Sequence, residues 1–147
     1  MEDNPADIRL VEEALAHGET ASRLHVAWDG EEALRFLRRQ PPHLEAGPDV
    51  ILLDLDLPGR DGHEVLAAVK GDASLSSIPE IVFTRSRREE DVLRAYRLRA
   101  NAYVVKPPGL EAFLEAVRRI EEFWLRVATP PARSETGPEE AAAGASD

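Results

Sequence analysis

The sequence predicts an α/β fold in which helices cover both faces of a parallel sheet. Segments with the pattern of strands alternate along the chain with segments that have the pattern of helices, as in βαβ units. The runs at 50–53 and 78–83 are almost continuously apolar, and such strands lie inside a sheet that is covered on both faces. The length of 147 residues suits one domain with a substantial core.

The first helix is predicted at residues 4–18. Asn4 can cap its amino end, Pro5 suits the first helical position, and Gly18 marks its end. Apolar residues three and four positions apart give this helix one inward face. The segment 23–28 follows as a short strand.

A second helix is predicted at residues 29–39, where Asp29 and Glu32 have the spacing of a capping box. The run 50–53 is the next strand, and its four apolar residues suit a central position. The segment 62–70 then has the apolar spacing of a helix that packs on the sheet.

The second half of the chain repeats this alternation. Strands are predicted at 78–83 and 101–105, and helices at 89–100 and 110–127. From residue 129 the composition turns to Pro, Ala, Glu, Gly and Ser, which cannot bury a core. We therefore predict that 129–147 is a disordered acidic tail.

Composition excludes several classes of function. The net charge of −10 argues against a nucleic acid or an anionic membrane as partner, because both attract clustered Lys and Arg. The absence of cysteine removes disulfides and thiolate chemistry and fits a reducing compartment. No apolar run approaches the roughly 20 residues that span a bilayer, and the polar start is unlike a signal peptide. We expect a cytoplasmic protein.

Polar side chains stand where the predicted strands end, at the edge where open parallel sheets bind ligands. They are Asp54, Asp56, Thr84 and Lys106, with Glu2 and Asp3 just before the first helix. Carboxylates at close range repel one another unless a cation lies among them, and hard oxygen ligands suit Mg²⁺. A lysine and a hydroxyl then remain to meet an anion, and a phosphoryl group fits.

Four motifs carry a family resemblance: "EDNPAD", "LLDLDLPGRDG", "FTRS" and "YVVKP". Their order and spacing resemble the receiver domain of two-component response regulators, which implies a flavodoxin-like, five-stranded sheet of order 2-1-3-4-5. On this basis we assign residues 1–128 to a receiver domain. "DGEEALRFLRR", "REEDVLRAY" and "IEEFWL" are most similar to single-domain regulators paired with bacterial phytochrome histidine kinases.

The resemblance assigns a chemical role to each polar residue. Asp54 would accept a phosphoryl group from a kinase histidine, and Lys106 would pair first with Asp54 and then with a phosphoryl oxygen. Thr84 would move its hydroxyl onto the phosphoryl group, and Tyr103 would change rotamer with it. These two are the expected switch residues.

The resemblance also implies the ligands of Mg²⁺. Asp3 and Asp54 would bind the metal directly, Asp56 would bind it through its backbone carbonyl, and Glu2 would bind it through water. Taken singly, Glu2 and Asp3 also suit a helix N-terminus, and Thr84 is a common strand residue. Their joint placement at one edge favours the functional interpretation.

Two positions depart from the family pattern. Arg85 follows Thr84 where receivers more often carry a small residue, and its long side chain can lie over the phosphoryl group or extend into solvent. In addition, only Met1 precedes the acidic pair, so the first strand of the sheet is largely missing. We expect a native start about six to ten residues upstream, a typical strand length.

Two other functions remain open at this stage. "LLDLDLP" also resembles the motif of haloacid-dehalogenase-type phosphohydrolases, in which Asp54 would be a nucleophile and Asp56 a general acid or base. Against this, the motif lies in the middle of the chain, and no acidic pair follows Lys106. The third possibility is a receiver-like interaction module that is never phosphorylated.

The last predicted helix, 110–127, has two apolar strips. One strip can dock on the sheet and comprises Leu110, Phe113, Leu114, Val117, Ile120 and Trp124. The second comprises Ala112, Ala116 and Phe123. Apolar surface beyond the needs of the core often marks an interface, so we predict a homodimer through this helix and its flanking strand, as the phytochrome-type resemblance also suggests.

Overall fold

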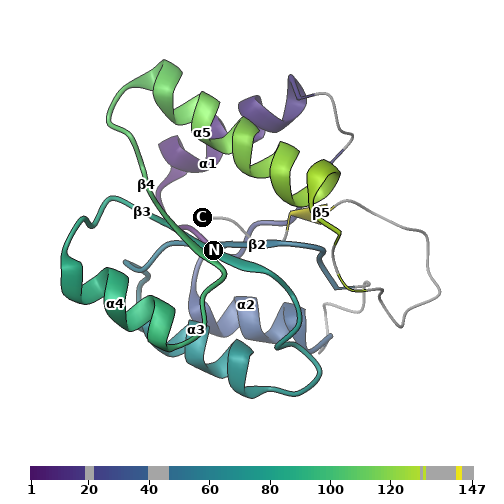
Figure 1. Ribbon diagram of the computed structural model, residues 1–147, viewed down its shortest axis with the longest axis vertical. Helices are drawn as coiled ribbons and strands as arrows, with labels where there is room; N and C mark the ends of the chain where they lie inside the picture. The colour runs from purple at the N-terminus through teal and green to yellow at the C-terminus, as the bar shows by residue number, and fades with distance from the viewer. Residues whose placement is uncertain (19–21, 40–46, 130, 132–141, 144–147) are drawn as a thin grey trace.

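A computed structural model describes residues 1–18, 22–39, 47–129, 131 and 142–143. A central sheet lies between α1 and α5 on one side and α2, α3 and α4 on the other (Figure 1). The helices are α1 (Pro5–Ala16), α2 (Gly30–Leu37), α3 (Gly62–Gly71), α4 (Glu89–Arg97) and α5 (Leu110–Glu122), which continues into a π-helical turn, η1 (Phe123–Val127). The strands are β1 (Arg23–Leu24), β2 (Ile51–Leu53), β3 (Glu80–Thr84), β4 (Ala102–Val105) and β5 (Ala142–Ala143).

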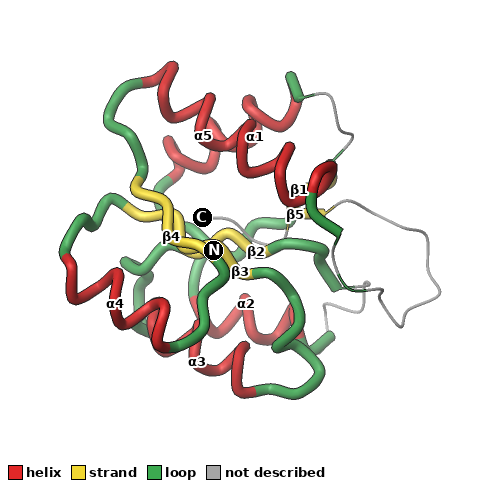
Figure 2. The backbone as a smooth tube through the Cα atoms, in the orientation of Figure 1, coloured by secondary structure: helices red, strands yellow, loops and turns green. Residues whose placement is uncertain are grey.

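The predicted parallel α/β architecture is confirmed. Strands β2, β3 and β4 form a parallel sheet in that order (Figure 2), with Leu53 opposite Val82 and Thr84 opposite Val105. This register places the carboxyl ends of the three strands at one edge, as the site prediction requires. These strands correspond to the last three places of the expected order, whereas β1 pairs with β5 in a separate two-stranded sheet.

Met1 lies beside β2 and holds the start of the chain against it. Its amino group donates to the Leu52 carbonyl at 2.6 Å, and its own carbonyl accepts from the Asp54 amide at 3.1 Å. The Glu2 amide donates to the Ala27 carbonyl at 3.0 Å. These bonds fix the peptide that carries Glu2 next to the end of β2.

One predicted strand is shorter in the structure. The strand expected at 23–28 is only Arg23–Leu24, because a regular ladder forms only where these residues pair in parallel with Ala142 and Ala143. Those two residues form β5. The remaining residues after 131 lie outside the described part of the chain.

The helix caps follow the sequence closely. The Asn4 side chain accepts hydrogen bonds from the backbone amides of Ala6 and Asp7, and the Asp29 side chain accepts from the Glu32 amide. Glu32 reaches back to the amide of Trp28, one residue before the cap.

Among the described residues, no helix has both the length and the hydropathy needed to span a bilayer.

Helix α5 docks on the sheet through most of the predicted strip. Phe113, Leu114 and Val117 are buried, and Ile120 and Trp124 pack against the same core. Leu110, the first residue of α5, does not: its side chain is 56% exposed. The prediction for Leu110 was therefore wrong.

Glu80, the first residue of β3, places an acidic side chain inside the core. Its side chain is fully buried, and neither carboxyl oxygen has a hydrogen-bond partner among the described residues. Burial raises the pKa of Glu80 from 4.5 to about 8, although the charges of Lys70 and the amino terminus oppose this shift. A neutral carboxyl is less costly to bury than a carboxylate, so Glu80 is largely protonated at neutral pH.

We predict that Glu80 makes the folded protein less stable as pH rises. Between pH 4.5 and about 8, the folded protein keeps a proton on Glu80 that the unfolded chain has already released. The free energy of unfolding therefore falls as pH rises across this window. The variant Glu80→Gln, which cannot ionise, should lose less stability over the same range. Urea unfolding at both ends of the window measures the difference.

The matched control is Glu64→Gln, which neutralises an exposed glutamate of α3. It should keep the pH dependence of the original protein. If Glu80→Gln and the original protein lose stability in parallel, Glu80 does not bind the proton in question.

Candidate functional site

Asp54 lies directly after β2, at the carboxyl edge of the sheet. All three residues of β2 are buried, and Asp54 is itself only 7% exposed. The following loop folds back so closely that the Gly62 amide donates to the Leu55 carbonyl at 3.0 Å. A Cβ at Gly62 would stand 2.6 Å from the Asp54 carbonyl, so this approach requires glycine.

Lys106 reaches the same place from the end of β4. Its amide donates to the Thr84 carbonyl at 2.7 Å, which aligns the ends of β3 and β4. Its buried Nζ donates to Glu2 Oε1 at 2.5 Å and to Asp54 Oδ2 at 2.9 Å. The structure thus brings together three of the predicted site residues: Glu2, Asp54 and Lys106.

A third carboxylate on Lys106, that of Asp7, was not predicted. Asp7 Oδ2 accepts from Lys106 Nζ at 2.8 Å, and Asp7 Oδ1 accepts from Arg85 Nη2 at 2.9 Å. Asp7 belongs to the first turn of α1, where an acidic residue is ordinarily a surface charge favoured by the helix dipole. The signal that marks it is spacing: Asp7 stands four residues before the buried Val11, on the inward face.

Further carboxylates crowd the same edge. Burial raises the pKa of Asp56, and the negative charges of Asp54, Asp91 and Asp3 raise it further, while Lys106 lowers it. Asp3 and Asp56 are both exposed, and neither is drawn onto Lys106. This repulsion between hard oxygen donors fits a divalent cation, which would relieve it.

In their present arrangement, the described residues include no three His, Asp or Glu side chains that are already poised around one point as metal ligands. The reason is visible in the contacts of Lys106, which holds Glu2, Asp7 and Asp54 around an ammonium group. A cation that used Glu2 or Asp54 would therefore compete with Lys106 for them.

The two expected switch residues both contact Ser86. Thr84 is fully buried, and its hydroxyl accepts from the Ser86 amide at 3.4 Å. The Tyr103 hydroxyl donates to the Ser86 carbonyl at 2.9 Å, and Ser86 Oγ donates to Asp91 of α4 at 2.5 Å. A movement of Thr84 would thus act on the loop that leads into α4.

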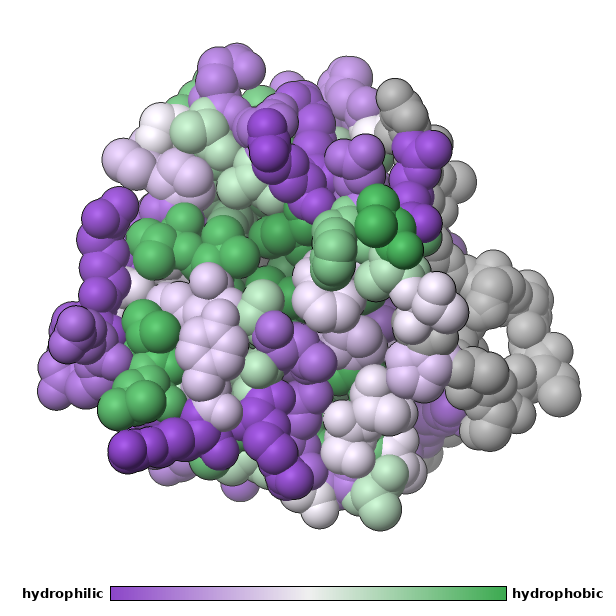
Figure 3. Space-filling model, in the orientation of Figure 1, coloured by the Kyte–Doolittle hydropathy of each residue, from purple (hydrophilic) through white to green (hydrophobic). Residues whose placement is uncertain are grey.

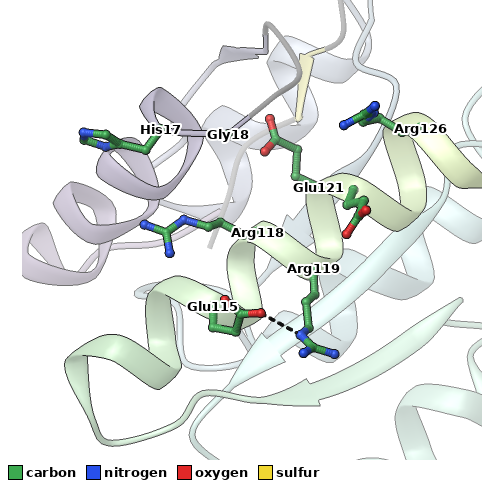
Figure 4. A pocket seen from close by; sticks show the side chains of 8 residues that line it. His17, Gly18, Glu115, Arg118, Arg119, Glu121 and Arg126 are labelled. Atoms are coloured by element: carbon green, nitrogen blue, oxygen red, sulfur yellow. Dashed lines mark hydrogen bonds and ion pairs between the residues drawn. The ribbon is translucent and has the colours of Figure 1, made fainter.

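A polar pocket lies elsewhere, between the end of α1 and the middle of α5 (Figure 4). Its lining carries both signs of charge, and Glu115 pairs there with Arg119 at 2.8 Å. The Glu121 carboxylate, which accepts from Ser22 Oγ, lies directly against Gly18, so a side chain at position 18 would have to displace it. Because α1 starts at the Asp54 edge and ends here, this pocket belongs to the opposite edge of the sheet.

Comparison with known proteins agrees with this geometry. The family described as the response regulator receiver domain matches residues 1–118. Response regulator Rcp1 of Synechocystis sp. is 41% identical over 133 residues, which cover 90% of this chain and 90% of Rcp1.

Two crystal structures are similar over nearly the whole chain. The phosphorylated cyanobacterial phytochrome response regulator RcpA has a TM-score of 0.87 and 44% identity, with coverage of 90% of this chain and 95% of RcpA. The Mn²⁺-bound form of Rcp1 has a TM-score of 0.85 and 41% identity, with coverage of 90% and 96%. The chain belongs to the response regulator receiver domain family.

Proposed function

We propose that the protein is a single-domain response regulator that accepts a phosphoryl group from a histidine kinase on Asp54. The observation that carries this proposal is the contact between Asp54 and the buried Lys106 at 2.9 Å, at the carboxyl edge of the sheet. An ammonium group at this position can neutralise charge that develops on the oxygens of a transferring phosphoryl group. The phosphorylated state of the relative RcpA supports the same chemistry.

A divalent cation, which we propose to be Mg²⁺, would complete the site. Asp3 and Asp54 would hold it directly, Asp56 through its backbone carbonyl and Glu2 through water. The raised pKa of Asp56 and the Mn²⁺-bound form of Rcp1 support a cation at this edge. When bound, the metal would neutralise the oxygens of the incoming phosphoryl group.

The residues of the chain itself would then respond to the new charge. Lys106 would keep its place and bind a phosphoryl oxygen. Thr84 would turn its hydroxyl toward the phosphoryl group and release the Ser86 amide, to which it is now bonded. Because Tyr103 holds the carbonyl of the same Ser86, the two residues would move together and change the surface next to α4.

The kinase partner is proposed from the relatives. RcpA is named as a phytochrome response regulator, so we propose a phytochrome-type histidine kinase as the phosphoryl donor. We further propose that the exchange takes place in the cytoplasm, because the absence of cysteine suits a reducing compartment. The protein would hold the phosphoryl group as a signal rather than turn over a phosphate ester as an enzyme does.

We also propose a homodimer through α5 and the neighbouring β4. Figure 3 shows hydrophobic side chains in a band across the middle of one face, between α5 and α4. Phe123, at the start of η1, is 48% exposed, and Val127 is 64% exposed. Exposed apolar side chains that continue from the docked face of a helix are typical of an interface.

We predict that Asp54→Asn abolishes labelling. Radioactive phosphoryl groups would be supplied once by acetyl phosphate in Mg²⁺ and once by a phytochrome-type histidine kinase. The amide cannot form the acyl phosphate, so both labels should disappear. The matched control is Asp72→Asn, which removes a carboxylate after the far end of α3 and should label like the original protein.

Persistent labelling of Asp54→Asn would show that the acceptor is another residue. Rapid turnover of p-nitrophenyl phosphate by the original protein would instead favour the phosphohydrolase. Labelling by acetyl phosphate but by no phytochrome-type kinase would contradict only the partner.

For the dimer, we predict that Phe123→Glu shifts the protein toward monomer, because it places a charge in the apolar contact. The control, Trp28→Glu, changes a side chain of nearly equal exposure, 47%, that precedes α2, and it should leave the mass unchanged. Light scattering over a range of concentrations measures both. Equal mass for Phe123→Glu and the original protein at every concentration would contradict the interface.

A further inference from the structure

Asp7 and Arg85 form an ion pair at 2.9 Å beside the proposed acceptor. Asp7 is fixed: its side chain is 5% exposed and belongs to the first turn of α1. Arg85 extends from the end of β3, and its side chain is 54% exposed. The pair thus joins an immobile carboxylate to a cation with room to move.

Asp7 also holds the lysine of the site. One of its oxygens accepts from Arg85 at 2.9 Å, and the other accepts from Lys106 at 2.8 Å. Lys106 in turn donates to Asp54 at 2.9 Å. A continuous chain of charged contacts therefore connects the guanidinium of Arg85 to the acceptor carboxylate.

Phosphorylation of Asp54 would change the balance of charge in this chain. A single carboxylate would be replaced by an acyl phosphate with about two negative charges at neutral pH. Lys106 is buried among three carboxylates, whereas Arg85 can rotate through solvent. Guanidinium also binds phosphoryl oxygens well, because its planar donors match two of them at once.

We propose that Asp7 is a positioning residue that competes with the phosphoryl group for Arg85 and so shortens the lifetime of the acyl phosphate. In the resting protein Asp7 holds Arg85 beside the site. After transfer Arg85 exchanges the Asp7 carboxylate for a phosphoryl oxygen, where it shields the phosphorus from water. This role rests on the proposed function of Asp54 as the acceptor. It assigns the lifetime of the phosphoryl group to the pair Asp7–Arg85.

The step under control is hydrolysis of the acyl phosphate. A water oxygen bonds to phosphorus while the bond between phosphorus and the Asp54 oxygen breaks. The electron pair of that bond stays on the Asp54 carboxylate, and the water releases a proton to solvent to leave inorganic phosphate. A guanidinium across the phosphoryl oxygens hinders the approach of this water.

The experiment follows loss of label after removal of acetyl phosphate, in four proteins. Arg85→Ala should lose the label about two- to fivefold faster than the original protein, the range expected for a half-exposed ion pair. Asp7→Asn should lose it slower by a similar factor, because Arg85 is freed for the phosphoryl group. The double variant should lose the label at the same rate as Arg85→Ala alone, because Asp7 then has no Arg85 to hold.

Two controls make the result specific. Arg87→Ala removes an exposed arginine from the same loop and should leave the lifetime unchanged. Urea unfolding of the unphosphorylated proteins in EDTA tests the resting contact without any phosphoryl chemistry. There, Arg85→Ala should lower the unfolding midpoint of the original protein but not that of Asp7→Asn.

Several outcomes would overturn the proposal. An equal or shorter lifetime for Asp7→Asn would show that Asp7 does not compete for Arg85. A longer lifetime that persists in the Arg85→Ala background would assign the effect to Lys106 alone. If the effects of Asp7→Asn and Arg85→Ala on the unfolding midpoint are additive, the two residues do not form an ion pair in the unphosphorylated protein. If the original protein takes no label at all, the assignment of Asp54 fails instead, and the unfolding experiment still decides whether the pair exists.

Discussion

The structure of the site depends on one buried ammonium group, that of Lys106. Its Nζ contacts the carboxylates of Glu2, Asp7 and Asp54, which come from the start of the chain, from α1 and from the end of β2. Without a cation at this point, the carboxylates would repel one another in a region with little water. Lys106 thus both assembles the edge of the sheet and holds the acceptor ready for a phosphoryl group.

The same contact explains why the metal ligands are not already gathered. Glu2 and Asp54 turn toward Lys106, while Asp3 and Asp56 stay exposed. The excess negative charge also affects Asp56: burial and the neighbouring carboxylates raise the pKa of this residue. A divalent cation would share the carboxylates with Lys106, so metal binding and phosphoryl transfer both redistribute one set of ion pairs.

The sequence predicted the architecture and the edge of the sheet that carries the candidate site, because both follow from local patterns. Apolar runs define β2 and β3, and parallel strands bring their following residues, Asp54 and Thr84, to one edge. Asp7 and Glu80 were missed because each is a single acidic residue inside an apolar pattern. Whether such a carboxylate is paired, as Asp7 is, or protonated, as Glu80 largely is, depends on partners distant in sequence.

If Lys106 balances three buried carboxylates, the variant Lys106→Met should strongly destabilise the protein. Methionine keeps most of the volume and removes the charge, so the carboxylates would lose their common partner. The measurement is the free energy of unfolding in urea at neutral pH, for the variant and for the original protein. We expect a loss of about 3 kcal/mol or more, as for other buried ion pairs broken on one side. A loss below about 1 kcal/mol, the value of an ordinary surface pair, would contradict it.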